Sequence, residues 1–444
     1  MSLLRAPDGG AVQRAPDGGA VQRSVLPCGL RVVTEQLPGS RSAAVGMWVA
    51  VGSRDEPPSV AGAAHFLEHL LFKGTTRRTA GQIAEEIDAV GGELNAFTTK
   101  EHTCYHAHVL DRDLPLAIDL VCDVLGNALL DPTDVDTERG VVLEEIAMRD
   151  DDPEELAHEE LCAALFGAHP LARPVLGSEA SITGMSRAAL HRFYRRRYTP
   201  QRMVLAATGN VTHTAVLEAL RHSFGPHLTG TAPPARPRRG RATAAAQRCL
   251  VVRRNSSEQA HFMLGVPALN RHDRRRYALG VLNAALGAGM SSRLFQQVRE
   301  KRGLAYSVYS TVDCYADTGC LSIYAGCSPG RLGAVATVIR QVLEDLARDG
   351  LSGSELARGK GQLRGALVLG LEDPMSWLNR IGTAELNYND HPSVEQELQR
   401  IDDVNVEQVG ELAQALLRRP LTVAVVGPYA GPQQLPAEVA ELVA

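Results

Sequence analysis

The two halves of this chain repeat the same order of sequence landmarks, and that repeat limits the folds open to it. Three pairs of landmarks correspond: Thr103-Cys104 with Gly319-Cys320, Asp152-Pro153 with Asp373-Pro374, and an apolar run ending at Gly209 with another ending at Gly427. Their lags are 216, 221 and 218 residues. Because a nearly constant lag with a matching order indicates duplicated units, the sequence predicts two homologous α+β domains, each a mostly antiparallel sheet packed with helices.

Hydrophobic periodicity and capping signals predict the elements of the first half. β-branched and apolar runs indicate strands at 30–35, 43–51, 93–98, 103–109 and 203–209, with the first two joined by a turn. Spacings of three and four residues indicate helices at 62–73, 80–90, 116–125 and 134–149. Thr79 is placed to cap the second of these helices, and Gly91-Gly92 to end it.

Composition divides the chain into five stretches. Residues 5–13, RAPDGGAVQ, recur unchanged at 14–22, and a tandem rich in Gly, Pro and Asp predicts a disordered tail at 1–23. Residues 227–247 carry no apolar periodicity and are interpreted as a linker between a first domain at 24–226 and a homologous domain at 248–430, with a C-terminal tail at 431–444. The linker's Arg cluster suits an anionic partner, but a solvated linker is favoured.

Overall composition excludes several classes of protein. The 444 residues suffice for two or three domains, and 44% hydrophobic with 22% charged content is ordinary for a globular protein. A net charge of −5 gives no reason to expect a nucleic acid as partner. Neither a membrane-spanning run nor a signal peptide is recognisable, so we expect no membrane and a cytoplasmic, bacterial location. The eight cysteines form no CxxC pair, which favours reduced thiols over disulfides.

The pentapeptide at 65–69, HFLEH, is the strongest candidate for chemistry. On a helix, residues four apart share a face, so both imidazoles can reach one divalent cation, with the Glu68 carboxylate beside them. A catalytic zinc needs a third protein ligand, which we expect on a neighbouring helix as a carboxylate or histidine. Glu138, Glu144 and Glu145 are candidates; Glu138 and Glu145 share a helix face, whereas Glu144 points elsewhere.

Further motifs accompany a pentapeptide that could arise alone by chance. They are LLFKGT at 70–75, GG at 91–92 with NAFT at 95–98, VLEEI at 142–146, SRLF at 292–295 and REKRGLAYS at 299–307. With these motifs in this order, nearly everything after residue 24 resembles the pitrilysin family of zinc endopeptidases, whose HxxEH signature is that of the inverzincins. The resemblance is strongest to its two-domain bacterial branch and to the β subunit of mitochondrial processing peptidase.

The resemblance implies a metal site and the roles of its residues. It implies one Zn²⁺ per chain held by His65, His69 and Glu145. It also implies that Glu68 is the general base and that Glu138 is a supporting acidic residue of the catalytic set. These roles suit the chemistry, because a zinc ion lowers the pKa of its bound water and a neighbouring carboxylate can accept the proton.

Four more residues match substrate-binding positions of that family. By resemblance, Asn95 and Ala96 lie on an edge strand that accepts an extended peptide, and Arg299 and Tyr306 approach the substrate carbonyl from the second half. By residue type alone, Asn95 is equally well explained as a polar residue near a strand start. Arg299 would then be a solvated charge and Tyr306 half-buried packing.

The second half lacks the chemical groups of the first. Its counterpart of the histidine helix, 279–286, holds no histidine, and Ala366 stands opposite Glu145 at the lag of 221. The sequence therefore predicts that only the first domain carries the metal site.

Together these features predict a zinc endopeptidase that hydrolyses peptides or unfolded polypeptide segments. We expect a homodimer in which Arg299 and Tyr306 complete the site of the partner chain. The alternative is a catalytically silent structural or assembly subunit, because the family contains inactive members; the intact ligand set argues against it. A purely structural zinc is a third possibility, but Glu68 inside the motif favours chemistry.

Overall fold

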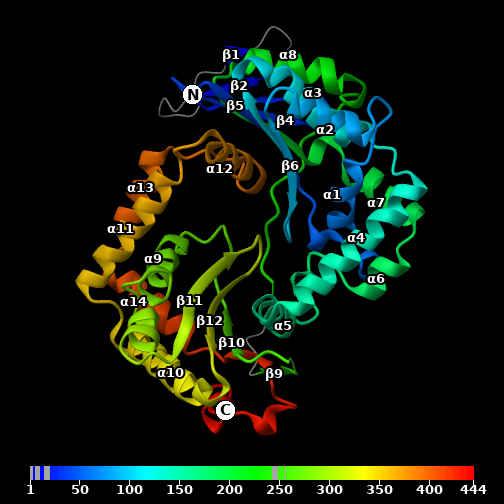
Figure 1. Cartoon of the computed structure of the whole chain (residues 1–444). Helices are drawn as coiled ribbons and strands as arrows, with labels where there is room; N and C mark the ends of the chain where they lie inside the picture. The colour runs from blue at the N-terminus through cyan, green and yellow to red at the C-terminus, as the bar shows by residue number, and fades with distance from the viewer. Residues whose placement is uncertain (1–3, 6–10, 15–20, 243–248, 255) are drawn as a thin grey trace. The chain divides into compact units, whose positions relative to one another are not determined.

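The computed structural model describes residues 4–5, 11–14, 21–242, 249–254 and 256–444 (Figure 1). Contacts between residues divide the chain into two compact units. Unit 1 comprises Met1–Ile146, Pro174–Pro237 and Leu369–Ser393, and unit 2 comprises Ala147–Arg173, Arg238–Val368 and Val394–Ala444. Each unit is an α+β structure with one mixed sheet, as the sequence predicts.

Unit 1 is built on a sheet with the strand order β1-β2-β3-β4-β8-β5-β7-β6. The strands are β1 (Leu4–Arg5), β2 (Ala11–Arg14), β3 (Val21–Val25), β4 (Arg31–Gln36), β5 (Ser42–Val49), β6 (Glu93–Thr98), β7 (Thr103–Leu110) and β8 (Met203–Gly209). Only the β4–β8 pair is parallel among these neighbours. The strands expected at 30–35 and 43–51 form as β4 and β5, but β8 lies between them, so they are not a hairpin.

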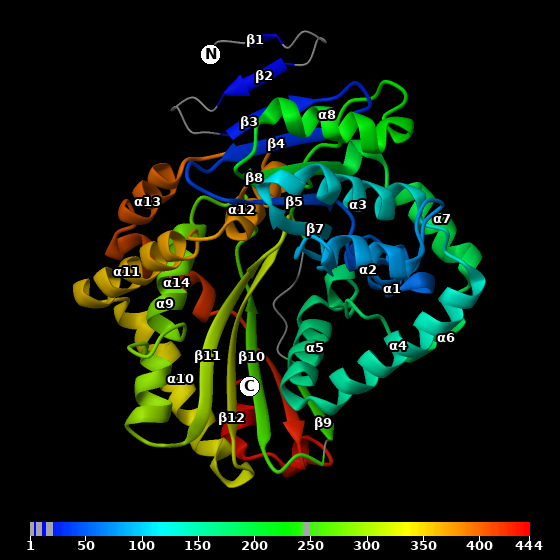
Figure 2. The ribbon, with the colours of Figure 1, turned by 45° about the horizontal axis from the view of Figure 1, so that its top comes forward.

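Helices cover both faces of this sheet. The helices of this unit are α1 (Ala63–Leu71), α2 (Ala80–Asp88), α3 (Leu114–Asn127), α4 (Pro132–Asp151), whose last residues belong to unit 2, α6 (Glu179–Gly184), α7 (Arg187–Arg197), α8 (His213–Phe224) and α12 (Pro374–Asn387). The main core joins one face of the sheet to α1, α3 and α8, and Figure 2 shows α3 and α8 along that face. A smaller core joins the other face to α12.

The α12 face is closed by tight packing and by a buried ionic cluster. Trp48 is fully buried there, and a Cβ on Gly382 of α12 would come within 2.7 Å of its indole ring. Glu385, also fully buried, accepts hydrogen bonds from Arg23 at 2.9 and 3.0 Å and pairs with His391 at 2.8 Å. The buried Arg31 donates to the Glu385 carbonyl at 3.1 Å.

Unit 2 is built on a sheet with the order β11-β12-β10-β13-β9. Its strands are β9 (Cys249–Arg254), β10 (Ala260–Pro267), β11 (Ala305–Cys314), β12 (Gly319–Cys327) and β13 (Thr422–Gly427). Its helices are α5 (Pro153–Phe166), α9 (Arg276–Leu286), α10 (Leu332–Asp349), α11 (Gly353–Leu369), α13 (Val394–Asp402), α14 (Val406–Leu417) and α15 (Ala437–Glu441). A π-helix, η7 (Phe295–Glu300), precedes β11.

The duplication predicted from the landmarks is visible in the sheets. The order β4-β8-β5-β7-β6 matches β9-β13-β10-β12-β11, and each sheet has its parallel pair at the same place. The two Asp-Pro landmarks begin corresponding helices, because Asp152 caps α5 and Asp373 caps α12.

These two helices are exchanged between the units. α5 comes from the first half of the chain but packs on the sheet of unit 2, where Leu156 and Leu161 share a core with Met263 and Val426. α12 comes from the second half and packs on the sheet of unit 1. Each unit therefore draws on three stretches of chain, whereas the sequence predicts contiguous domains at 24–226 and 248–430.

The tails and the linker carry more structure than their composition indicates. Within the region 1–23 predicted as a disordered tail, residues 4–5, 11–14 and 21–23 pair as strands, and the other residues of this region lie outside the described ones. In the linker, Ala232 and Ala235 donate to Pro27 and Gln201 of unit 1, whereas Ala242 donates to Asp317 of unit 2. In the stretch 431–444, α15 packs into the core of unit 2.

Two further observations concern the chain as a whole. The seven cysteines whose side chains the structure describes are free thiols, and six of them are buried. Among the described helices, none has both the length and the apolar character needed to cross a membrane.

Candidate metal centre

The histidine helix α1 is anchored by a glycine and a buried carboxylate. Gly62 precedes it with a φ of 90°, and a Cβ there would come within 2.6 Å of the Leu176 carbonyl oxygen. The buried Glu56 accepts hydrogen bonds from the backbone N–H groups of Gly62 and Ala64, both at 2.7 Å. A carboxylate at this end of a helix satisfies free N–H groups and complements the helix dipole. The anchor fixes which face of α1 enters the core.

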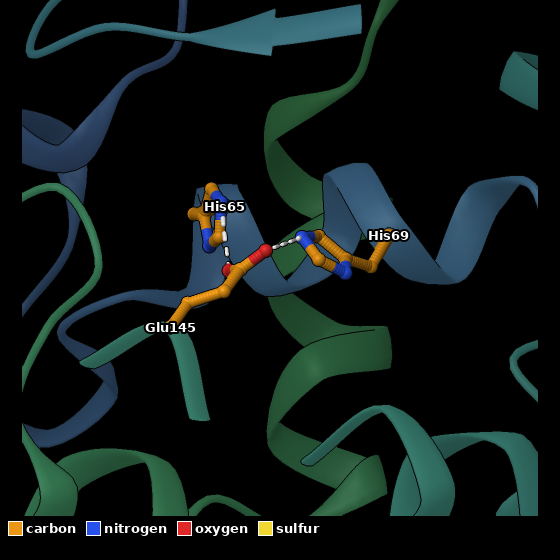
Figure 3. A group of neighbouring side chains, drawn as sticks. All are labelled: His65, His69 and Glu145. Atoms are coloured by element: carbon orange, nitrogen blue, oxygen red, sulfur yellow. Dashed lines mark ion pairs between the residues drawn. The ribbon is translucent and has the colours of Figure 1, made fainter. Parts of the chain in front are cut away.

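The face of α1 that points away from the core carries the candidate ligands. Six residues of α1 are buried in the core of unit 1, whereas His65, Glu68 and His69 are half-buried. The Glu145 carboxylate on α4 lies between the two imidazoles, as Figure 3 shows. Its oxygens are 3.6 Å from His65 Nε2 and 3.5 Å from His69 Nε2.

The two distances from Glu145 to the imidazoles fit a tetrahedral metal ion. One ligand atom from each of the three residues lies within 4.8 Å of the others. Zinc bonds of 2.0 to 2.2 Å place tetrahedral N and O ligands about 3.3 to 3.5 Å apart, close to the two distances found here. Within the described part of the chain, no other cluster of His, Cys, Asp or Glu side chains meets this spacing.

The electrostatics of the cluster also call for a cation. Burial, with a smaller contribution from His69, lowers the pKa of His65 to about 4. His65 is therefore neutral at neutral pH, so its contact with Glu145 is not an ion pair. The buried Oε2 of Glu145 has no hydrogen-bond partner among the described residues. The Glu145 oxygen and the neutral His65 nitrogen face each other and form no hydrogen bond. Both are therefore available as metal ligands.

Glu138 lies behind His69 and not at the open face of the cluster. Its Oε2 is 3.2 Å from His69 Nδ1, and its Oε1 forms an ion pair with Lys73 Nζ at 2.8 Å. A carboxylate at Nδ1 fixes the imidazole tautomer and leaves Nε2 free to bind a metal. The structure thus places Glu138 as a positioning residue for His69.

Glu68 directly precedes His69 on α1 and is held by the neighbouring strand β6. Its Oε2 accepts a hydrogen bond from Thr98 Oγ1 at 2.5 Å. Burial raises the pKa of Glu68, and this effect outweighs the opposing hydrogen bond from Thr98. The nearby charges of His69 and Glu145 also act on this carboxyl, which places it beside the cluster.

Asn95 and Ala96 lie on β6, which is the last strand of its sheet. The Ala96 N–H donates to Asn95 Oδ1 at 2.8 Å and so is not used in the ladder with β7. β6 ends at Thr98, the residue that donates a hydrogen bond to Glu68.

Arg299 and Tyr306 belong to unit 2. The Arg299 guanidinium stacks on the Tyr306 ring at 4.8 Å from its centroid. Tyr306 lies at a β-bulge in the pairing of β11 with β12 and is 80% exposed, so it is not the packing residue that its type alone would indicate.

Three residues of the site were not singled out from the sequence: Glu56, Lys73 and Thr98. Lys73 and Thr98 lie inside the motifs LLFKGT and NAFT, so the motifs gave a signal for both. Glu56 gave none, because its partners are backbone groups of a helix that begins several residues later.

The site combines two histidines one turn apart with a carboxylate from a second helix, and the fold is a duplicated α+β structure. Together they define the class of two-domain metallopeptidases of the inverted zincin type. The family model described as "Insulinase (Peptidase family M16)" matches residues 31–179, and that described as "Peptidase M16 inactive domain" matches residues 184–363. The chain belongs to peptidase family M16, and the predicted resemblance to the pitrilysin family is confirmed.

Relatives and solved structures agree with this assignment. An "uncharacterized zinc protease" of Mycobacterium leprae is 55% identical, with 94% of each chain covered. Another "uncharacterized zinc protease", from Bacillus subtilis, is 38% identical, with 90% of this chain and 96% of that one covered. The crystal structure of a protease from Helicobacter pylori has the same fold, with a TM-score of 0.84 at 23% identity over 92% of this chain and 99% of that one.

Proposed function

We propose that this protein is a zinc endopeptidase that hydrolyses peptides or unfolded polypeptide segments. The observation that carries the proposal is the complete constellation on α1 and α4: His65, His69 and Glu145 grouped for a metal, with Glu68 beside them. The family membership and the names of the relatives support the reaction class.

In this proposal, zinc is held by His65, His69 and Glu145. The chemistry that an ion bound there would supply is polarisation of the scissile carbonyl and acidification of a water molecule. Glu68 accepts the proton of that water and passes it to the leaving amine. Thr98 keeps the Glu68 carboxylate in place through its hydrogen bond, and Glu138 keeps His69 in the tautomer whose Nε2 is free.

The edge of β6 supplies the binding surface in this proposal. An extended peptide that pairs with Asn95 and Ala96 would displace the Asn95 side chain from the Ala96 N–H and lead toward Thr98. Backbone pairing gives affinity with little dependence on side chains. We therefore expect broad sequence tolerance along this strand.

The test combines metal analysis with cleavage of a fluorescence-quenched peptide. Glu68→Gln should keep one zinc per chain and lower kcat/KM about 10²- to 10⁴-fold, the usual contribution of a general base. Glu145→Gln should lose zinc, whereas Glu144→Gln, the same change at the exposed neighbouring residue, should leave zinc content and cleavage unchanged. Equal cleavage by Glu68→Gln and the parent chain would reject the mechanism, and no cleavage by the zinc-loaded parent would favour the silent-subunit alternative.

We further propose that the protein acts as a homodimer in which Arg299 and Tyr306 complete the site of a second copy. Their place in the half without metal ligands motivates this proposal. Mixing Glu68→Gln chains with Arg299→Ala chains should then restore one working site per dimer. A mixture no more active than either variant alone would reject the shared site.

A further inference from the structure

Unit 2 contains a cavity of about 530 Å³ at the start of its edge strand β11. Its polar lining includes Arg299, Arg331, Gln259, Tyr306 and Ser328, and none of the described residues that line it is an Asp or Glu. This volume falls within the range of small-ligand sites. Two guanidinium groups around a cavity without carboxylates, in a chain whose net charge is −5, create a local excess of positive charge.

Among the described residues, no carboxylate pairs with either arginine, and both are held in place by other contacts. The Arg299 guanidinium lies between two rings, 4.9 Å from the centroid of Phe295 and 4.8 Å from that of Tyr306. Arg331 donates a hydrogen bond to the Gly303 carbonyl. Stacking and one backbone bond orient the guanidinium planes but leave N–H groups at their edges free to donate.

The first half of the chain shows that the fold does not require these charges. Leu294 and Val298 are buried four residues apart like Ile83 and Ile87 of α2, which aligns Arg299 with Asp88. The 3₁₀ turn η8 (Pro329–Arg331) corresponds to η3 (Asp111–Asp113), which aligns Arg331 with Asp113. Both positions are aspartate in the half that carries the metal cluster and arginine in the half that lacks it.

Two backbone irregularities shape this corner of unit 2. The π-helix at 295–300 widens the turn that carries Arg299, and the β-bulge at Tyr306 turns that side chain out of the sheet. The register shift between Ala305 and Ser307 leaves Tyr306 as one extra residue in β11. Wide turns and bulges of this kind re-aim side chains, and here they bring the Tyr306 ring onto Arg299.

We propose that this cavity is a carboxylate-binding subsite, in which Arg299 and Arg331 receive a carboxylate of a peptide. The identity of the ligand as a peptide rests on the proposed function. The carboxylate comes either from the C-terminus of the peptide or from an Asp or Glu side chain. A planar guanidinium matches the two oxygens of a carboxylate, and such charge-assisted pairs are stronger than neutral hydrogen bonds.

The experiment measures binding of four matched fluorescent peptides to the full-length Glu68→Gln chain by anisotropy. One peptide has a free C-terminal carboxylate and no acidic side chain, and its control has a C-terminal amide. A second pair has amidated ends and differs only by an internal Glu or Gln. We expect at least one carboxylate-bearing peptide to bind about tenfold or more tightly than its neutral control; which pair responds identifies the source of the carboxylate.

Arg331→Gln should abolish that tenfold preference and leave the affinity for the neutral peptides unchanged. Arg274→Gln removes one charge from an exposed position of the same unit outside the cavity and should keep the preference. Arg331→Lys keeps the positive charge but lacks the planar guanidinium. This variant should therefore retain only part of the preference for the carboxylate-bearing peptide. If Arg331→Gln does not fold, judged by its melting temperature, the comparison of Arg331→Lys with the parent chain decides.

Three results would overturn the subsite: equal binding of acidic and neutral peptides by the parent chain, a preference that survives Arg331→Gln, or an equal loss in Arg274→Gln. A binding preference without peptide cleavage by the zinc-loaded parent would reject the proposed function and keep the subsite. Cleavage without a binding preference would reject the subsite alone.

Discussion

The helix pair α1 and α4 of unit 1 and its counterpart α9 and α11 of unit 2 share one architecture but differ in chemistry. At the lag of 216, Val281 and Ala285 stand where unit 1 has His65 and His69. At the lag of 221, Gly359 stands opposite Glu138. A Cβ on Gly359 would come within 3.1 Å of the Val281 side chain, so small residues let these two helices pack directly.

This difference shows which residues the helix packing requires and which only the metal site requires. The apolar pair shows that the architecture forms without imidazoles or carboxylates at these positions. Burying His65, Glu138 and Glu145 costs free energy of desolvation, and only their contacts with one another or with a cation offset it. The polar pair is therefore best explained by function. The units also differ at the exchanged helices. α12 is held by the Glu385 ion cluster, and α5 by apolar contacts together with a Tyr309–Glu154 hydrogen bond of 2.6 Å and an Arg253–Glu160 ion pair of 3.5 Å.

The largest effect is expected when unit 1 receives the residues of unit 2. In the triple variant His65→Val, His69→Ala and Glu145→Ala, bound zinc should fall from one ion per chain to none. In the presence of a chelator, the variant should unfold at the same free energy as the parent or at a higher one, because apolar replacement of buried charge is neutral or stabilising. Metal analysis and denaturant titration check both statements. A variant that unfolds well below the metal-free parent would show that the polar cluster supports the fold.

The two exchanged helices should respond very differently to loss of their polar contacts. Glu385→Ala leaves the buried Arg31 and the partly buried Arg23 without a counter-charge, and we expect a loss of about 3 to 5 kcal/mol in the free energy of unfolding. Tyr309→Phe removes a single hydrogen bond to α5 and should cost about 1 kcal/mol. Urea titration of both variants measures the contrast. Equal losses would mean that α5 and α12 are anchored alike.

Glu138→Gln tests whether the carboxylate behind His69 contributes to metal binding. An amide at this position is a weaker acceptor for the imidazole N–H and no longer pairs with Lys73, so zinc affinity should fall about 10- to 100-fold. Competition with a chelator of known affinity gives the value, and Glu144→Gln serves as the control for a change of one charge on α4. An unchanged affinity would remove Glu138 from the site.

The smallest expected effect is a pH dependence of the α12 anchor. Burial opposes ionisation of Glu385, but hydrogen bonds from His391 and Arg23 outweigh it, so its pKa lies below the usual 4.5. A carboxyl group with a lowered pKa stabilises the folded state fully above 4.5, and this contribution is lost as the pH falls through the folded pKa. The stability difference between the parent and Glu385→Gln should therefore be constant between pH 6 and 8 and shrink below about pH 4.5. A difference that grows on acidification would contradict this assignment.

Most elements and the shared face of His65 and His69 could be predicted because their signals are local. Spacing left Glu138, Glu144 and Glu145 open as the third ligand, and only the family resemblance favoured Glu145. The spacing of His65 and His69 fixes their shared face, and Glu138 and Glu145 are seven residues apart on another helix, so both meet the same imidazole. The sequence also revealed that the second copy lacks the ligands.

What the sequence did not reveal depends on contacts between distant segments. The Asp-Pro caps indicate where α5 and α12 begin. Both helices have ordinary apolar faces, so only tertiary packing decides which sheet each one covers. The strands β1 and β2 were missed for a similar reason: a Gly- and Pro-rich composition predicts disorder, whereas the open edge of β3 offers backbone groups for pairing. The resemblance grouped Glu138 with the catalytic residues as a supporting acidic residue, and its contacts with His69 and Lys73 could not be read from spacing.

The exchange of α5 and α12 also sets an order of events during synthesis. The sheet face around Trp48 is covered by residues 374–387, which leave the ribosome only after most of unit 2 has been made. At a translation rate of about 5 to 20 residues per second, α12 is synthesised on the order of ten seconds or more after the strands of that face. The nascent first half thus carries an apolar surface of the kind that chaperones bind, and it is released from that state by a helix of the second half.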